Sequence, residues 1–343
     1  MALILTVSCS KINRPILDKK YIPYDLADSV SASVCLWKQN KRAAYTIAFD
    51  DVRPSHYLIS APELSKRTMV GTFNLNTANV SNWNHWRTVA KRGDELASHT
   101  VHHVKLTALS DDSIRWELQK SKEIIERMVP QNGPVLSFTN PYGLGDERVK
   151  SIVKQYYLSE RDNWGTNVSS MTPEQLYDVK GIGVYPPFDQ AKLKEKLELT
   201  LKKRAWILIY FHTVTTNPDT TDICQCPLDF FIDHLKFVQS KRDSFWIATQ
   251  RDVAKYILAR TGAAVELQKI NSFTIKIRIK NVVKVNLLDL IVSVRLKLPV
   301  EWVGNNLEIH DKNGNTTNRK NLRKYAIISF RLNQHYFLKG FKL

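Results

Sequence analysis

Tyr45-Thr46-Ile47-Ala48-Phe49-Asp50-Asp51 is an apolar stretch, rich in β-forming residues, that ends in two adjacent carboxylates. An apolar run without polar alternation is typical of a parallel strand that is covered on both faces. In barrel-shaped and open-sheet α/β folds, active sites lie at the carboxyl ends of such strands. Asp50 and Asp51 are therefore candidate functional residues. The alternative is a loop whose acidic side chains cap the following helix.

A cluster of histidines follows a second short apolar segment, Leu96-Ala97. The cluster contains His99, His102 and His103, which are three of the nine histidines in the chain. The i, i+4 spacing of His99 and His103 would put both rings on one side of a helical turn. Two imidazoles with one carboxylate are a common ligand set for a catalytic divalent metal. The alternative is a polar surface turn whose histidines bind nothing.

Two further segments complete a pattern. Phe138-Thr139-Asn140-Pro141-Tyr142-Gly143 follows a short apolar segment, and the apolar stretch Ile207 to Phe211 ends at His212. The order F-D-D, H-T-x-x-H, P-Y-G and apolar-x-x-H resembles the polysaccharide deacetylases of carbohydrate esterase family four. That family includes chitin, chitooligosaccharide, peptidoglycan and acetylxylan deacetylases. The resemblance runs over roughly residues 43–260 and includes a closing segment, Phe245-Trp246-Ile247-Ala248-Thr249-Gln250.

Strand-like and helix-like segments alternate between residues 43 and 262, which predicts a parallel α/β architecture. The clearest helix is expected to begin at its N-cap Ser110 and to end before Pro130. Periodicity does not separate an open sheet from a barrel. The resemblance implies a distorted (β/α) barrel of the polysaccharide deacetylase type, with about seven strands.

After Thr261-Gly262 the apolar residues recur with period two, as in Phe273 to Ile279 and Leu290 to Leu298. Together with the turn signal Asn313-Gly314, this pattern predicts a small C-terminal antiparallel β-sandwich. We therefore expect three parts: residues 1–42 as a lead-in packed against the main domain, 43–262 as the catalytic domain, and 263–343 as the sandwich. The sandwich is interpreted either as a module that binds a glycan or partner, or as a structural cap.

The chain of 343 residues carries a formal net charge of +17, which suits either anionic partners or a solvated basic surface. It shows no nucleic-acid-binding motif, and its basic residues are scattered along the chain rather than clustered, so no nucleic-acid partner is expected. No apolar run reaches the length of a transmembrane helix. The four cysteines do not form a disulfide framework, and Cys224-Gln225-Cys226 lacks the second pair that a metal site would need.

The first ten residues, Met1 to Ser10, resemble the end of a lipoprotein signal over residues 1–9, with Cys9 as the lipid-accepting residue. The alternative is a short strand. With the resemblance to envelope-glycan enzymes, this segment predicts an extracytoplasmic protein, periplasmic or on the cell surface, that is anchored through Cys9. The oligomeric state is left open.

The resemblance implies a role for each motif residue. Asp50 would be the general base, and Asp51, His99 and His103 would bind one divalent metal ion, with zinc expected first and cobalt, nickel or iron as alternatives. His212 would protonate the leaving group, and the backbone N–H of Tyr142 would help hold the oxyanion. Pro141, Tyr142 and Trp164 would contact the substrate, although Trp164 could instead simply pack.

One position departs from the family pattern. Thr139 stands where an arginine usually helps to position the catalytic aspartate. Without a nearby cation the carboxylate of Asp50 would be looser and its pKa higher. We predict that Arg161 reaches Asp50 and replaces the missing arginine. The alternative is that Arg161 is a surface arginine and that Asp50 works without a cation.

These residues predict a metal-dependent hydrolase that removes acetyl groups from an N- or O-acetylated polysaccharide or oligosaccharide. Two other hypotheses remain open. One is a glycan-binding protein that keeps the fold but has lost catalysis, against which the presence of all five motif residues argues. The other is a metal hydrolase that acts on a different ester or non-peptide C–N bond, which only a substrate assay separates.

Overall fold

The computed structural model describes residues 30–130, 134–167, 170–219, 221–281, 290–319 and 323–341. The described residues form two compact units, one of residues 42–255 and the other of residues 30–41 and 256–341. Residues 1–29, and with them the proposed lipid-accepting Cys9, lie outside the described residues. Within the described part of the chain, no helix combines the length and the apolar character needed to cross a membrane.

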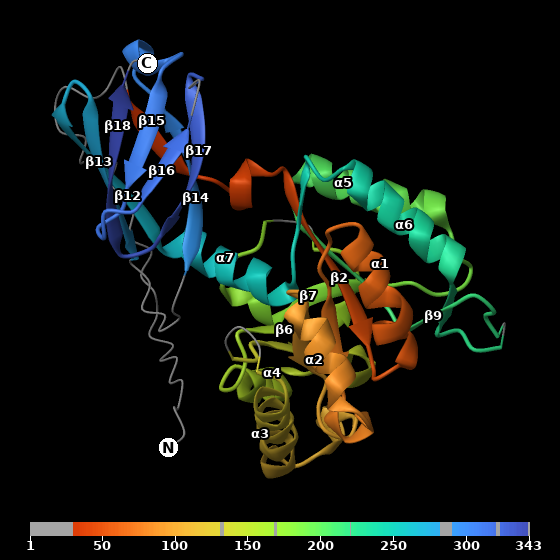
Figure 1. Cartoon of the computed structure of the whole chain (residues 1–343). Coiled ribbons are helices and arrows are strands. Elements are labelled where there is room, and N and C mark those ends of the chain that lie inside the picture. The colour runs from red at the N-terminus through yellow and green to blue at the C-terminus, as the bar shows by residue number, and fades with distance from the viewer. Residues whose placement is uncertain are drawn as a thin grey trace. The chain divides into compact units, whose positions relative to one another are not determined.

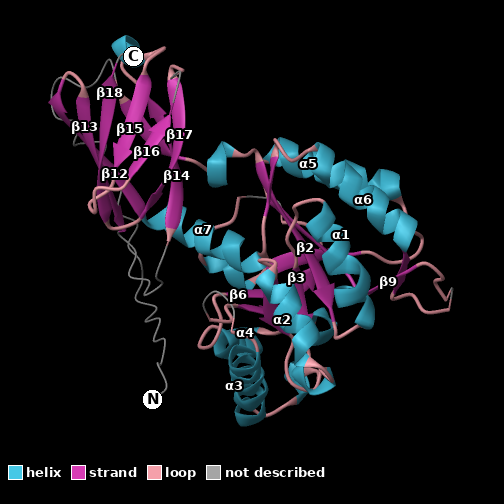
Figure 2. Ribbon diagram, viewed as in Figure 1, coloured by secondary structure: helices cyan, strands magenta, loops and turns pink. Residues whose placement is uncertain are grey.

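The first unit is a closed barrel of seven parallel strands, because the first strand pairs with the last. This confirms the predicted distorted (β/α) barrel, and Figure 2 shows its strands in magenta among cyan helices. An eighth short strand, β11 (Phe245–Ile247), pairs with the start of β2 outside the closed ring. The barrel strands are β2 (Ala43–Asp50), β3 (Thr72–Leu75), β4 (Glu95–Ser98), β5 (Ser137–Thr139), β6 (Ser159–Trp164), β7 (Val179–Gly183) and β8 (Trp206–Phe211).

Helices follow most of the barrel strands (Figure 1). The segment after β2 begins as a π-helical turn, His56–Ser60, before it becomes α-helical, which sequence periodicity does not reveal. The N-cap predicted at Ser110 is confirmed, since its hydroxyl accepts a hydrogen bond from the backbone N–H of Ser113 at 3.3 Å. The helices are α1 (Ala61–Lys66), α2 (Trp83–Lys91), α3 (Asp111–Met128), α4 (Glu147–Val153), α5 (Gln190–Lys203), α6 (Leu228–Ser240) and α7 (Gln250–Gly262).

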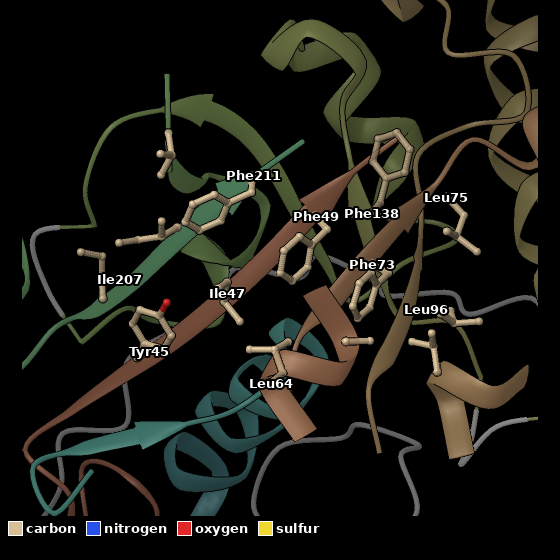
Figure 3. Close-up of a cluster of buried hydrophobic side chains, with 14 of the residues drawn as sticks. Tyr45, Ile47, Phe49, Leu64, Phe73, Leu75, Leu96, Phe138, Ile207 and Phe211 are labelled. Carbon is tan, nitrogen blue, oxygen red and sulfur yellow. The ribbon is translucent and has the colours of Figure 1, made fainter. Parts of the chain in front are cut away.

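Strand β2 is buried along its whole length, as its apolar sequence predicts. Phe49 stacks on Phe73 of the neighbouring strand with ring centroids 4.8 Å apart, and it also contacts Phe211 of β8 (Figure 3). The strand pairs with β8 through Phe49 and with β3 through Asp50. This packing fixes the carboxyl end of β2, and therefore Asp50 and Asp51, at one end of the barrel.

The second unit contains two antiparallel sheets, as predicted for the tail. Alternate residues of the strands, such as Ile275, Ile277 and Val294, are buried in one core. The first sheet has the order β1 (Ser31–Val34), β14 (Ile291–Lys297) and β17 (Tyr325–Arg331). The second has the order β12 (Ala263–Asn271), β13 (Thr274–Asn281), β18 (Gln334–Phe341), β15 (Asn306–His310) and β16 (Thr316–Arg319).

The lead-in contributes the strand β1 to this second unit. Ser31 to Val34 pair antiparallel with β14, and the alternating Ala32 and Val34 pack against the core of the sandwich. Residues 31–34, which were expected to pack against the main domain, thus form a strand of the sandwich. A four-residue strand with two serines carries too little apolar pattern to predict its partner.

Candidate functional site

Asp50 lies at the carboxyl end of β2 and is 3% exposed. Asn74, its neighbour in register on β3, donates from Nδ2 to Oδ1 of Asp50 at 2.8 Å, and Arg161 donates from Nη2 to Oδ2. Burial alone would raise the pKa of Asp50, but the Arg161 guanidinium, with His99 and His212, holds this pKa well below its usual range. The carboxylate is thus ionised and fixed at both oxygens.

Arg161 belongs to β6, where it is in register with Thr139 of β5. Residues in register on adjacent parallel strands point to the same face of the sheet, so Arg161 reaches the place that a longer side chain at Thr139 would fill. Its guanidinium carbon lies 4.0 Å from the ring centroid of Tyr210, which supports it from β8. The structure therefore brings Arg161 to Asp50, one strand away from the position that the family pattern suggests.

Asp51, His99 and His103 form a group that can hold a metal ion, with one ligand atom of each within 4.8 Å of the others. Nε2 of His103 lies 3.3 Å, and Nε2 of His99 3.8 Å, from Oδ1 of Asp51. Nδ1–H of His99 donates to the carbonyl oxygen of Thr139 at 2.7 Å, which leaves Nε2 as a lone-pair donor. Burial lowers the pKa of His99 to about 4, so the ring is neutral, as a metal ligand must be.

The two histidines are brought together by an irregular loop and not by the helical turn that their spacing suggested. Thr100 and His103 have φ of 67° and 56°, in the left-handed region that non-glycine residues seldom occupy. The backbone N–H of His103 donates to the hydroxyl of Thr100 at 2.9 Å, which holds this conformation. Asp51 and Tyr142, with φ of 69° and 63°, also lie in the left-handed region. Such strained residues cluster at functional sites.

Glu117 of α3 holds this histidine loop in place by hydrogen bonds. None of the sequence motifs points to this residue. Its carboxylate is buried and accepts hydrogen bonds from the backbone N–H groups of Val101 and His102, at 2.7 and 3.1 Å. It also accepts one from Nδ1 of His102 at 2.7 Å. A signal was available, because Glu117 interrupts the apolar face that Ile114 and Leu118 define on α3.

His102, which had no assigned role, lies outside the metal-ligating group. Its side chain is 51% exposed and stacks on the ring of Trp116, with centroids 5.7 Å apart. It therefore serves as a contact between the loop and α3.

His212 follows β8 at the same end of the barrel. Burial lowers its pKa, while Asp50 and Asp51 oppose this effect. Its backbone carbonyl accepts a hydrogen bond from Nε2–H of the buried His56 at 2.8 Å, and the ring of Tyr185 lies 5.6 Å from its own. The charges of the two aspartates thus act on the imidazole of His212, and the hydrogen bond from His56 fixes the backbone of His212.

The turn Pro141–Gly143 forms one rim of the site. The ring of Tyr142 is half-exposed and lies 4.7 Å from that of His103. Trp164 is 70% exposed and lies so close to Gly143 that a Cβ there would be 2.9 Å from its indole nitrogen. Pro141, expected to contact substrate, is buried in the turn. Tyr142 and Trp164 are thus exposed on this rim, and their contact with a substrate stays a prediction.

Part of the chain is similar to known proteins. Residues 38–160 match the family described as Polysaccharide deacetylase. A gellan lyase from a Bacillus species is 21% identical over 293 residues, which is 79% of this chain and 12% of that protein. A putative polysaccharide deacetylase, YxkH of Bacillus subtilis, is 25% identical over 142 residues, 39% of this chain and 50% of that protein. The chain thus spans half or less of these relatives.

Solved structures of similar fold include the Xyl-CE4 domain of a multidomain xylanase from the hindgut metagenome of Trinervitermes trinervoides. It is 17% identical, covers 62% of this chain and 89% of that chain, and has a TM-score of 0.43. A second is a CE4 family pseudoenzyme from Bacillus anthracis, which is 16% identical, covers 63% of this chain and 66% of that chain, and has a TM-score of 0.42.

Proposed function

We propose that the polysaccharide deacetylase domain identified in this chain is a metal-dependent hydrolase that removes acetyl groups from an N- or O-acetylated polysaccharide or oligosaccharide. One observation carries the proposal. Asp50 is ionised and accepts a hydrogen bond at each carboxylate oxygen, and it lies beside a group of one carboxylate and two imidazoles, Asp51, His99 and His103. His212 lies at the same end of the barrel. General base, metal ligands and general acid are thus all available.

Asp51, His99 and His103 suit a divalent ion that accepts mixed nitrogen and oxygen ligands, such as zinc, with cobalt, nickel or iron as alternatives. When bound, such an ion acidifies water and polarises an acetyl carbonyl. The hydrogen bond from Nδ1 of His99 to Thr139 supports this assignment, because metal-ligating imidazoles usually donate their other N–H to a fixed acceptor.

Asp50 would take the proton of the attacking water. Arg161 keeps this carboxylate ionised and oriented, and Asn74 fixes its other oxygen, so Asp50 needs no rearrangement before it accepts a proton. His212 would give a proton to the leaving nitrogen or oxygen, and the backbone N–H of Tyr142 would help to stabilise the developing oxyanion. Tyr142 and Trp164 would contact the sugar from the rim.

The location of the protein is a separate proposal. A substrate in the cell envelope and a lipid-accepting Cys9 would put the protein outside the cytoplasm, in the periplasm or on the cell surface. Metabolic labelling with a fatty acid, compared between the natural protein and Cys9→Ala, tests this anchor directly.

The test of the function is acetate release from a panel of chitooligosaccharides, peptidoglycan fragments and acetylated xylan. We expect release from at least one of them, and Asp50→Asn should lower turnover about 10²- to 10⁴-fold, the usual contribution of a general base. Glu123→Gln, an exposed acid on α3, is the matched control and should keep full turnover. Tight glycan binding without acetate release would instead support the degenerate-fold alternative.

A further inference from the structure

Arg53 lies two residues after the metal-ligating Asp51, at the edge of the candidate site. Its Nη2 donates to Oδ2 of Asp51 at 3.1 Å, while Oδ1 of the same carboxylate lies 3.3 Å from Nε2 of His103. The two carboxylate oxygens of Asp51 therefore contact different partners, the guanidinium and the metal-ligating group. The Arg53 side chain remains 43% exposed, so part of the guanidinium faces the solvent from which a substrate arrives.

Arg53 has more hydrogen-bonding capacity than its described contacts use. A guanidinium carries five N–H donors in a planar fork, and Asp51 accepts from one of its terminal nitrogens. Among the described residues, the buried Nε of Arg53 has no hydrogen-bond partner. Within the described part of the chain, the other terminal donors of Arg53 make no hydrogen bond, so they can pair with a planar oxyanion, which arginine binds in bidentate fashion.

A second cation lies on the rim that the Pro141–Gly143 turn forms. Nζ of Lys105 is 5.5 Å from the ring centroid of Tyr142, which in turn contacts the ring of His103. Lys105 is exposed. By contrast, the charge of Arg161 is already used by the buried Asp50. Two accessible cations thus lie next to the candidate site, Arg53 on the Asp51 side and Lys105 on the Tyr142 side.

We infer that Arg53 recognises a carboxylate on the substrate, so that the glycan is one that carries uronic acid beside its acetylated sugar. This inference rests on the proposed deacetylase function and names its substrate class. A guanidinium pairs with carboxylate and with phosphate in the same bidentate manner, so the phosphate-bearing substrate in the experiment below separates the two anions. Lys105, a point charge on a flexible stem, supplies longer-range attraction to the same anion.

A purely positional role for Arg53 gives a different pattern of effects. If Arg53 only held Asp51 in place, its loss would weaken turnover of neutral and anionic substrates by the same factor. If Arg53 recognises the carboxylate, its loss lowers the ratio of kcat/KM for the anionic substrate to kcat/KM for the neutral substrate. The ratio therefore reports on recognition and is insensitive to any shared damage to the metal site.

The experiment measures kcat/KM for matched acetylated oligosaccharides that are neutral, uronate-bearing or phosphate-bearing. The natural protein should prefer the uronate over the neutral substrate, and Arg53→Ala should reduce this preference about ten- to a hundredfold, the range for hydrogen bonds to charged groups. Arg127→Ala removes an exposed arginine near the end of α3 and should keep the preference. The preference should also fall as salt is added.

Equal losses on the neutral and uronate substrates in Arg53→Ala would overturn the inference and leave the deacetylase function intact. A preference for phosphate over uronate would overturn the carboxylate assignment. If no substrate releases acetate, the proposed function fails instead. Calorimetric titration with the deacetylated uronate oligosaccharide then still tests Arg53, and equal affinities of the natural protein and Arg53→Ala would reject it.

Discussion

The pairing of Arg161 with Asp50 is the residue-level feature on which the catalytic proposal depends most. A buried carboxylate is a good general base only if its ionised form is stabilised, and burial by itself works against ionisation. The guanidinium supplies that stabilisation from β6, in register with the threonine that replaces the usual arginine. The chain thus keeps the cation although it has changed the strand that carries it.

Replacing Arg161 by alanine should therefore lower turnover sharply. The expected loss is about 10- to 100-fold, the range for a hydrogen bond between charged groups, and the acidic limb of the pH–rate profile should move to higher pH because the pKa of Asp50 rises. Steady-state kinetics of Arg161→Ala across pH measure both effects. Arg161→Lys should restore part of the turnover, since a lysine keeps the charge but not the planar fork.

Lys154→Ala, just beyond the end of α4, is the control and should behave as the natural protein. Full turnover and an unmoved acidic limb in Arg161→Ala would mean that Asp50 works without this cation.

The residue types of the site could be predicted from the sequence, but some of the geometry could not. Asp51, His99 and His103 converge as expected, although an irregular loop replaces the predicted helical turn. Left-handed backbone at Thr100 and His103 has no local signal, because neither residue is a glycine. Arg53 and Glu117 escaped notice because their roles depend on contacts that spacing does not encode.

At the level of elements, the apolar strands could be predicted from the sequence. The strands that contain charged site residues could not. The entirely apolar β8, Trp206–Phe211, covers the apolar stretch Ile207 to Phe211 that indicates it in the sequence. In contrast, the apolar segment Tyr156-Tyr157-Leu158 predicts a strand of its own, but the strand β6 lies just after it, at Ser159–Trp164. Glu160, Arg161 and Asp162 lie buried within it. Functional residues break the hydrophobic pattern that sequence reading relies on.

The start of β4 offers a test of stability that is independent of catalysis. Asp94 is 3% exposed and accepts a hydrogen bond from the backbone N–H of Gly71 at 2.8 Å. Burial raises its pKa from 3.8 to about 7. Between these values the unfolded chain ionises while the folded chain stays protonated, so folding becomes less favourable as pH rises from about 4 to about 7. Above pH 7 both states are ionised, and the full free-energy cost of burying the Asp94 charge remains.

Asp94→Asn removes the charge and keeps an acceptor for Gly71. We expect the variant to be more stable than the natural protein at pH 8, by several degrees in Tm, and to show no gain at pH 4. Thermal unfolding at the two pH values measures this difference. Asp233→Asn, an exposed residue of α6, should show no such pH-dependent gain. An equal change at both pH values would mean that Asp94 is ionised in the folded protein at pH 4.

For the whole molecule, the two units divide the proposed tasks. Every candidate catalytic and metal-ligating residue lies between Asp50 and His212, within the barrel unit. The sandwich contributes none of them, and its role as a glycan-binding module or a structural cap stays a prediction. Figure 1 shows the C-terminal strands of the sandwich in teal to blue. The period-two pattern of the C-terminal residues predicted this second unit. Strand β1 of the lead-in could not be predicted, because it pairs with β14, which lies far away in the sequence.

The central claim is that one metal ion, held by Asp51, His99 and His103, supports removal of acetyl groups. The most direct measurement is metal content by elemental analysis, taken together with acetate release, for the natural protein, His103→Ala and Asp50→Asn. The account predicts about one equivalent of metal in the natural protein and in Asp50→Asn, little in His103→Ala, and acetate release only where metal and Asp50 are both present. Equal metal content in the natural protein and His103→Ala, or full acetate release after the metal is removed, would contradict it.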